Sequence, residues 1–171
     1  MRLFLALECP NFDSGPLEHE LSAKPVGSYH ITLAFLGERP EATRVAEAVA
    51  PACVGRLPLR LEYRGLGAFH SSKAARVAWI GVRGAGLTEL AQAVRVAAQS
   101  QDRPFVGHVT LARFRPPRDI RPLLQRYSNC NCGSGTVEFV TLFRSTLQRD
   151  GAVHEPLFHI DGNGRAEAIT V

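Results

Sequence analysis

The chain has 171 residues, a length that suits one domain or two small lobes sharing a core. Hydrophobic residues make up 45% and charged residues 21%, a balance that excludes an intrinsically disordered chain. The formal net charge is +4, and 18 of the 20 basic residues are arginines, because Lys24 and Lys73 are the only lysines. Since arginine is spread along the whole chain, its position rather than its number must support any phosphate site.

The four cysteines follow no metal-binding or disulfide pattern. Cys130 and Cys132 form a C-x-C stretch without nearby partners, and Cys9 and Cys53 are isolated. The apolar N-terminal run ends at Glu8, too early for a signal peptide, and no stretch approaches the roughly 18 apolar residues of a membrane span. We therefore expect a cytoplasmic protein with reduced thiols and no contact with a membrane.

Hydrophobic spacing predicts an alternation of strands and helices. Strand runs alternate apolar and polar residues or are apolar throughout, whereas helix runs place apolar residues three and four positions apart. In chain order, the predicted elements are a strand over 1–8, a short helix within 10–24, a strand over 28–37, a helix over 39–50, strands over 57–70 and 75–82, a helix over 86–99, a strand over 105–114, a helix over 118–127, a hairpin over 136–160 that turns at Asp150-Gly151, and a tail over 161–171 that frays.

A five-residue motif occurs twice. Residues 30–34 read HITLA, and residues 108–112, 78 positions further on (108 − 30), read HVTLA. A repeat kept only for packing would preserve the apolar letters and let the polar ones drift, yet here both polar letters recur. Because hairpins are mixed with helices and each half carries one copy, we expect an α+β fold with antiparallel sheets. Two similar lobes would then face each other across a central cleft.

Strand geometry places a histidine beside a threonine in each copy. Residues i and i+2 of a strand point to the same face, so the polar letters share one face and the apolar letters the other. The polar face is expected to hold His30 and Thr32 and, in the second copy, His108 and Thr110; the opposite face is expected to hold Ile31, Leu33, Phe35, Val109 and Leu111.

Two facing imidazoles suit displacement at phosphorus. A neutral imidazole can activate the attacking oxygen, and an imidazolium can protonate the leaving oxygen on the opposite side. The threonine hydroxyls can donate hydrogen bonds to the non-bridging oxygens, where charge collects.

Other chemistries find less support in the sequence. Only Glu38 supplies an acidic group close to either motif, which does not complete a zinc ligand set. No G-x-S-x-G elbow, P-loop or G-x-G-x-x-G run is present. His154 and His159, in the predicted last hairpin, have no motif around them, and we interpret them as structural.

The double H-[IV]-T-L-A motif resembles the two-histidine phosphoesterase superfamily. Within it, the chain is similar to the RNA 2′,3′-cyclic phosphodiesterases, also called 2′-5′ RNA ligases. The likeness extends over MRLFLALE, HITLAFLG, GLGAFHSSKAARVAWIGV, GHVTLARF and VTLFRSTLQRDGAVHEPL. It implies two α+β lobes related by a pseudo-twofold axis, with both motif strands lining the cleft, so residues 1–171 would form a single two-lobed catalytic domain.

The resemblance also implies an activity and a set of site residues. The activity is metal-independent hydrolysis of an RNA terminal 2′,3′-cyclic phosphate to a 2′-phosphomonoester, which some members accompany with 2′-5′ ligation. The catalytic residues would be His30 and His108, with Thr32, Thr110 and Arg113 on the phosphate. Strict alternation puts Arg113 on the opposite face from His108, so the strand must bend or the side chain must reach round its edge. Relatives usually carry a tyrosine where this chain has His154.

The expected partner is the 3′ end of an RNA that carries a 2′,3′-cyclic phosphate, bound by a monomer without cofactor or metal. Five arginines crowd within fourteen residues after the second motif, and they form either an approach surface for RNA phosphates or a solvated helix face. They are Arg113, Arg115, Arg118, Arg121 and Arg126. Two other functions stay open: a non-catalytic module that binds RNA ends, and a phosphodiesterase for 2′-5′-linked oligonucleotides or small cyclic nucleotides.

Overall fold

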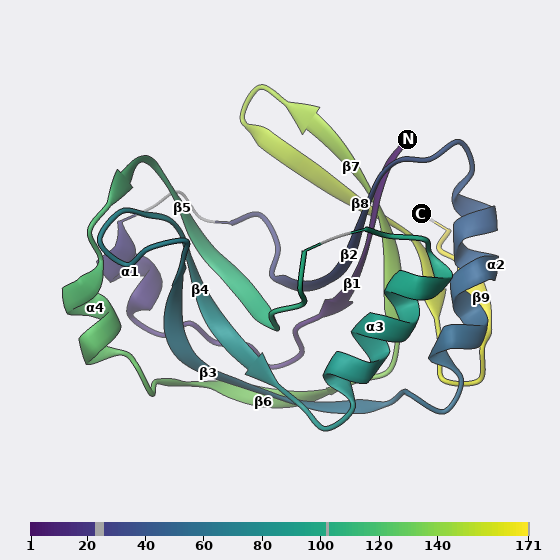
Figure 1. Ribbon diagram of the computed structural model, residues 1–171, viewed down its shortest axis with the longest axis horizontal. Helices are drawn as coiled ribbons and strands as arrows, with labels where there is room; N and C mark the ends of the chain where they lie inside the picture. The colour runs from purple at the N-terminus through teal and green to yellow at the C-terminus, as the bar shows by residue number, and fades with distance from the viewer. Residues whose placement is uncertain (23–25, 102, 171) are drawn as a thin grey trace.

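The structure, a computed structural model, describes residues 1–22, 26–101 and 103–170 and places them in two antiparallel sheets with helices packed against both (Figure 1). The first sheet has five strands in the order β2-β1-β7-β8-β9, and the second has four in the order β5-β4-β3-β6. The α+β prediction is confirmed. The strands are β1 (Arg2–Glu8), β2 (His30–Glu38), β3 (Leu59–Phe69), β4 (Ala75–Arg83), β5 (His108–Arg118), β6 (Asn131–Val137), β7 (Val140–Gln148), β8 (Gly151–Ile160) and β9 (Ala166–Ala168).

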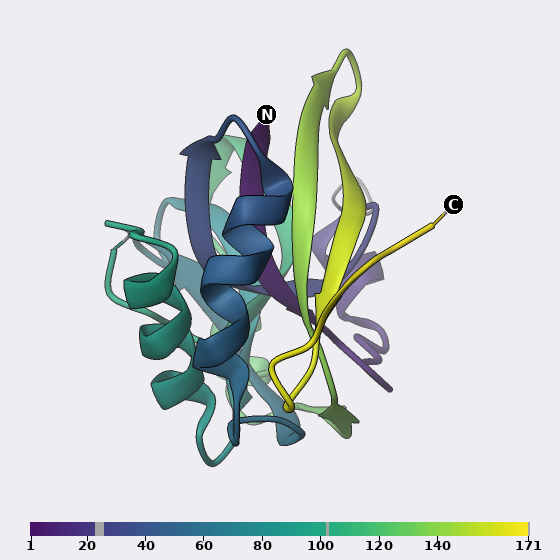
Figure 2. The same ribbon diagram turned by 90° about the vertical axis from the view of Figure 1, so that its right-hand side faces the viewer.

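The two longer helices lie side by side across one face of the five-stranded sheet (Figure 2). Helix α2 (Ala42–Cys53) contacts β7, β8 and β9, and α3 (Leu87–Ala97) contacts β2. The shorter helices α1 (Leu17–Leu21) and α4 (Arg121–Arg126) contact strands of the second sheet, β5 and β3 respectively. Among the residues described, no helix is long and apolar enough to cross a membrane.

Strand β1 is buried on both faces, which explains its uninterrupted apolar sequence. On one face Leu3, Leu5 and Leu7 belong to the main core. On the other face Phe4 and Ala6, with Phe143 of β7, form a second and smaller apolar cluster. This second cluster lies on the same face of the sheet as the polar residues of the first motif, so it provides an apolar floor beneath them.

Both strands that carry the motif are edge strands. β2 borders the five-stranded sheet and β5 borders the four-stranded sheet. The two edges contact each other without forming a hydrogen-bonded ladder. The two motif strands therefore lie beside each other where the two sheets adjoin, although they are far apart in sequence.

The C-terminal third differs from the prediction in two places. The hairpin of β7 and β8 turns between Gln148 and Gly151, close to the predicted position. However, the segment 136–160 is not a single hairpin, because residues up to Val137 belong to β6 and pair with β3 in the other sheet. The expectation of a frayed tail is also wrong in part, since residues Ala166–Ala168 form β9 against β8.

Candidate active site

A β-bulge follows the threonine of the first motif and changes which side chains reach the cleft. Ala6 pairs with Thr32 and Leu5 pairs with Ala34, so Leu33 is the extra residue of β2. Leu33 and Ala34 are both buried, and the alternation is reversed beyond them. Phe35 is therefore 60% exposed, and our prediction that it lies on the buried face is wrong.

The same bulge recurs in the second motif. Trp79 pairs with Thr110 and Ala78 pairs with Ala112, so Leu111 is the extra residue of β5. Arg113 consequently shares a face with Thr110, and the opposite face that strict alternation assigns to it is wrong. The bend allowed as one alternative is present, and it makes Arg113 the counterpart of Phe35 in the other sheet.

His30 is partly buried over the apolar floor of the first sheet. Its ring lies 5.3 Å from the ring of Phe4, between ring centroids, and it forms a hydrogen bond with the backbone of Ser28. Burial lowers the pKa of His30 from 6.5 to about 4, and the positive charges of His154, Arg113 and His108 add to this shift. His30 is therefore a neutral imidazole at neutral pH, the form that accepts a proton.

His108 in the second sheet, like His30 in the first, forms a hydrogen bond with the backbone two residues earlier. Its Nδ1 lies 2.7 Å from the carbonyl oxygen of Val106, two residues earlier, just as Ser28 precedes His30 by two. When Nδ1–H donates this bond, Nε2 is left to face the cleft. The ring stands perpendicular to the ring of Phe69, with 4.9 Å between the ring centroids. Burial lowers the pKa of His108, and the charge of Arg113 lowers it further.

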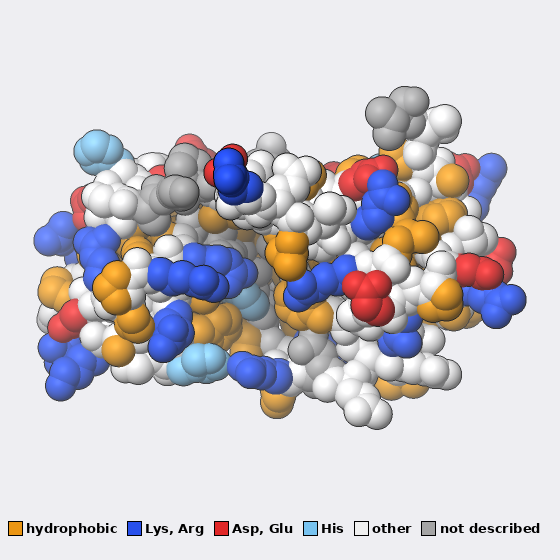
Figure 3. Space-filling model, turned by 90° about the horizontal axis from the view of Figure 1, so that it is seen from above, with side chains coloured by type: hydrophobic (Ala, Val, Ile, Leu, Met, Phe, Trp, Pro, Cys, Tyr) orange, Lys and Arg blue, Asp and Glu red, His pale blue; other side chains and the backbone are white. Residues whose placement is uncertain are grey.

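Arg113 lies close to three histidines of the cleft. Its guanidinium is close enough to lower the pKa of His30, of His108 and of His154. Within the described part of the chain it forms no hydrogen bond or ion pair, so its donors are available to an anion. From above, the surface is hollowed between the two halves, a histidine is visible inside the hollow, and basic side chains border it (Figure 3). Thr32 and Thr110 are partly buried on the same faces as the histidines.

His154 is a further candidate for the site, which the sequence indicated only through the resemblance. Its ring on β8 stands perpendicular to the ring of His30 at a centroid distance of 5.3 Å, and 4.8 Å from Phe4. Its Nδ1 is buried and has no hydrogen-bond partner among the described residues. The interpretation of His154 as structural stays a prediction, but its ring lies beside that of His30. The one sequence signal was the resemblance, in which relatives usually carry a tyrosine at this position. The structure adds the hairpin register, which pairs His154 with Ser145, two positions from Phe143.

Three of the five clustered arginines have partners within the protein. Arg118 donates to the carbonyl oxygen of Leu21 at 2.6 Å, Arg121 pairs with Asp119 at 2.7 Å, and Arg126 pairs with Glu20 at 3.2 Å. The role of the cluster as an approach surface for RNA phosphates therefore stays a prediction. Besides Arg113, only Arg115 is an exposed member without such a partner in the described residues.

The amino-acid sequence matches the model of the 2′-5′ RNA ligase superfamily over residues 21–147. The chain belongs to this superfamily. The matched residues include both copies of the motif and Arg113, whereas His154 lies beyond them.

Superfamily relatives in archaea and bacteria agree with this assignment. A protein from Aeropyrum pernix named RNA 2′,3′-cyclic phosphodiesterase is 33% identical over 146 residues, which cover 78% of this chain and 81% of the relative. A protein of the same name from Archaeoglobus fulgidus is 31% identical over 174 residues, with 92% and 98% covered. Among solved structures, TT0787 of Thermus thermophilus matches with a TM-score of 0.73 at 28% identity, covering 96% of this chain and 99% of that one. E. coli LigT in complex with 3′-AMP matches with a TM-score of 0.65 at 29% identity, covering 99% and 98%.

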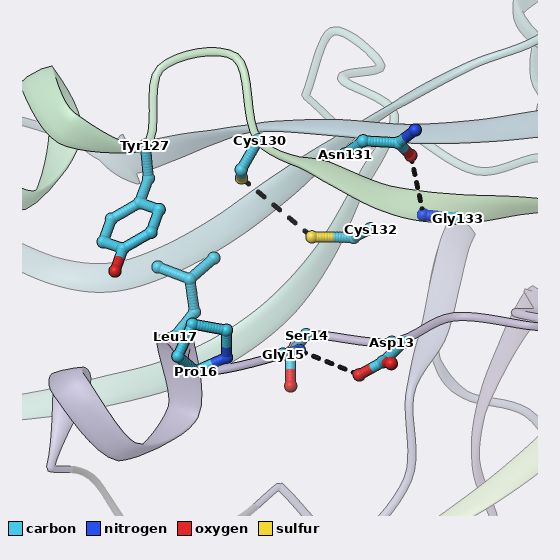
Figure 4. Close-up of a pocket in the computed structure, with 10 residues that line it drawn as sticks. All are labelled: Asp13, Ser14, Gly15, Pro16, Leu17, Tyr127, Cys130, Asn131, Cys132 and Gly133. Carbon is cyan, nitrogen blue, oxygen red and sulfur yellow. Dashed lines mark hydrogen bonds between the residues drawn. The ribbon is translucent and has the colours of Figure 1, made fainter.

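A separate cavity of about 410 Å³ lies between the segment before α1 and the start of β6 (Figure 4). None of the five predicted site residues lines it. It contains the thiols of Cys130 and Cys132, whose sulfur atoms are 4.0 Å apart. Burial raises the pKa of Cys132 to about 12, so its thiol stays protonated at neutral pH and is a poor metal ligand or nucleophile. Across the described residues, no group of three or more His, Cys, Asp or Glu side chains could hold a metal ion.

Proposed function

We propose that this protein is a metal-independent RNA 2′,3′-cyclic phosphodiesterase in which His30 and His108 act as an acid–base pair. Two observations support the proposal: the two motif strands contact each other, and Arg113 is close enough to both imidazoles to lower the pKa of each. The names of the relatives support the substrate class. E. coli LigT forms complexes with 3′-AMP and with phosphate, which are ligands of related chemistry. Every residue of the proposed site comes from one chain, so no second copy is needed.

The reaction requires one base and one acid on opposite sides of the phosphorus. Water adds to the phosphorus of the cyclic diester while one imidazole accepts the water proton. The bond between phosphorus and the 3′-oxygen breaks, and the other imidazole, as its imidazolium, gives a proton to that oxygen. The products are a 2′-phosphomonoester and a free 3′-hydroxyl, and the two imidazoles have exchanged protonation states.

We assign the base to His30 and the acid to His108. His30 has a pKa of about 4 in the free protein, so it is neutral and ready to accept a proton. His108 must be protonated to act as the acid, and the negative charge of a bound phosphate favours this form. Thr32 and Thr110 would donate to the non-bridging oxygens, and Arg113 would neutralise the charge that collects there.

The test is incubation with an RNA that ends in a 2′,3′-cyclic phosphate, with excess chelator present, followed by mapping of the product. A 2′-phosphomonoester is expected. His30→Ala and His108→Ala should each lower turnover by at least ~10²-fold, because a general acid or base typically contributes 10²- to 10⁴-fold. His159→Ala is the matched control, since His159 stacks on Phe139 at 4.9 Å and touches neither catalytic ring in the described contacts.

The alternative functions give different results in the same experiment. A module that only binds RNA ends would retain the cyclic phosphate unchanged. A metal-dependent enzyme would lose activity with chelator and regain it with zinc or manganese. A folded His30→Ala or His108→Ala variant with near-full turnover would contradict the two-histidine mechanism.

A further inference from the structure

Trp79, the only tryptophan in the chain, lies on the cleft face of the second sheet. It pairs with Thr110 across β4 and β5, so both side chains point to the face that carries His108. The indole ring is 5.9 Å from the ring of His108 and 5.2 Å from the ring of Phe69. Phe69 and Trp79 therefore form an aromatic surface directly beside the catalytic imidazole.

A glycine on the neighbouring strand holds the indole flat against the sheet. Gly67 pairs with Trp79, and a Cβ atom at Gly67 would lie 2.3 Å from the indole ring. Only glycine leaves the space in which the ring covers the backbone of β3. A ring held against backbone on one side has few alternative positions, so its other side is a rigid surface.

The aromatic rings packed against the two histidines differ in how accessible they are. Beneath His30, Phe4 and Phe143 are only 3% and 9% exposed, which makes them a buried support. By contrast, Phe69 and Trp79 are both partly exposed, and their rings are at least as large as those of Phe4 and Phe143. The indole nitrogen of Trp79 has no acceptor among the described residues, so hydrogen bonding does not explain the indole at this position.

We propose that Trp79 and Phe69 form a nucleobase-stacking subsite for the terminal nucleotide, adjacent to His108. This inference rests on the proposed function for the position of the phosphate. Stacking of a base on an aromatic side chain is tolerant of sequence because every base has a π-face. The subsite should therefore accept purines and pyrimidines with only modest preference. Loss of the stacking surface should weaken binding by about ten- to a hundredfold, the range usual for one stacked base.

The first test uses the intrinsic fluorescence of wild-type protein, since Trp79 is its single tryptophan. A nucleoside 2′-monophosphate is titrated in, with inorganic phosphate and ribose 5-phosphate as probes that lack a base, and calorimetry measures binding in parallel. Stacking predicts quenching by the nucleotide at the concentrations where calorimetry shows binding, and little change with the two other probes. Equal responses to all three probes, nucleotide binding without quenching, or no nucleotide binding would each overturn the subsite.

The second test separates binding from chemistry with substitutions. Trp79→Leu should raise KM for a 2′,3′-cyclic nucleotide about ten- to a hundredfold with little change in kcat, and Trp79→Phe should fall between it and wild type. Phe139→Leu, at an aromatic that contacts neither catalytic histidine in the described contacts, should leave both constants unchanged. If Phe35→Leu raises KM while Trp79→Leu does not, the base binds to the first sheet and the proposal is wrong.

The failures of the two proposals are distinguishable. Hydrolysis of the cyclic phosphate with wild-type KM in Trp79→Leu would remove the subsite and leave the catalytic assignment intact. Nucleotide-specific quenching without hydrolysis would remove the catalytic assignment and leave the subsite intact. Should Trp79→Leu not fold, the fluorescence titration of wild-type protein decides the question alone.

Discussion

The lowered pKa of His30 has a measurable consequence for folding stability. The imidazole has a pKa of 6.5 in the unfolded chain and about 4 in the folded protein. Between pH 6.5 and about pH 4, the unfolded chain binds a proton at residue 30 and the folded protein does not. The free energy of unfolding therefore falls as the pH is lowered through this range. At about 1.4 kcal/mol per pKa unit, the full shift from 6.5 to about 4 corresponds to about 3 kcal/mol.

The perturbation is His30→Gln, which keeps a polar side chain and removes the titrating group. Urea denaturation of wild type and variant at a series of pH values from 7 to 4 gives the free energy of unfolding at each pH. Over this range wild type should lose about 3 kcal/mol more than the variant, because both share every other titrating group.

Parallel stability curves for wild type and His30→Gln would refute the reasoning. They would show that His30 titrates alike in the folded and unfolded chains. The burial of His30 would then not explain the neutral imidazole that the proposed base requires.

Three further outcomes follow from the contacts of the cleft. Arg113→Met should raise KM for a cyclic phosphate substrate by roughly ten- to a hundredfold, since a hydrogen bond to a charged group contributes about 1.5–3 kcal/mol; an unchanged KM in steady-state assays would remove Arg113 from the phosphate site. His154→Phe should move the acidic limb of the pH–rate profile upward, because the charge of His154 lowers the pKa of His30, and an unmoved limb would contradict this coupling. Gly67→Ala should destabilise the protein by about 1–3 kcal/mol in thermal denaturation, because the new Cβ meets the indole ring. Gly27→Ala is its control, since a Cβ there meets nothing within 4 Å, and equal melting temperatures for both variants would contradict the packing.

The repeated motif was enough to predict the strands that carry the histidines, because local alternation determines which residues share a face. The motif did not predict on which face the residues beyond each bulge lie. Phe35 and Arg113 reach the cleft only because the pairing with β1 and β4 skips Leu33 and Leu111. Pairing register depends on the neighbouring strand, and the local periodicity of one strand carries no information about that neighbour.

Strand β6 was missed for a physical reason of the same kind. Its glycines and asparagine are typical of a loop, but the chain after β1 crosses directly over this strand. A Cβ at Gly133 would lie 2.5 Å from the carbonyl oxygen of Asn11, and one at Gly135 would lie 2.5 Å from that of Pro10. Glycine is required by this close approach, which depends on segments more than a hundred residues apart.

The contact of His154 with His30 was not predicted, because the two residues are distant in sequence. Nothing around it repeats the motif, and only the fold of the last hairpin brings its ring against that of His30. A lone histidine in a strand carries little information until its neighbours on other strands are known.

The central claim is that His30 and His108 transfer protons in hydrolysis of a 2′,3′-cyclic phosphate, and its most direct test is the pH dependence of single-turnover hydrolysis. The two imidazoles influence each other, so they should titrate as a coupled pair with two apparent pKa values. We predict a bell-shaped profile for wild type, loss of the acidic limb in His30→Ala, and loss of the basic limb in His108→Ala. A flat profile between about pH 5 and 9, with chemistry shown to limit the rate, would contradict the acid–base pair even if both histidines proved essential.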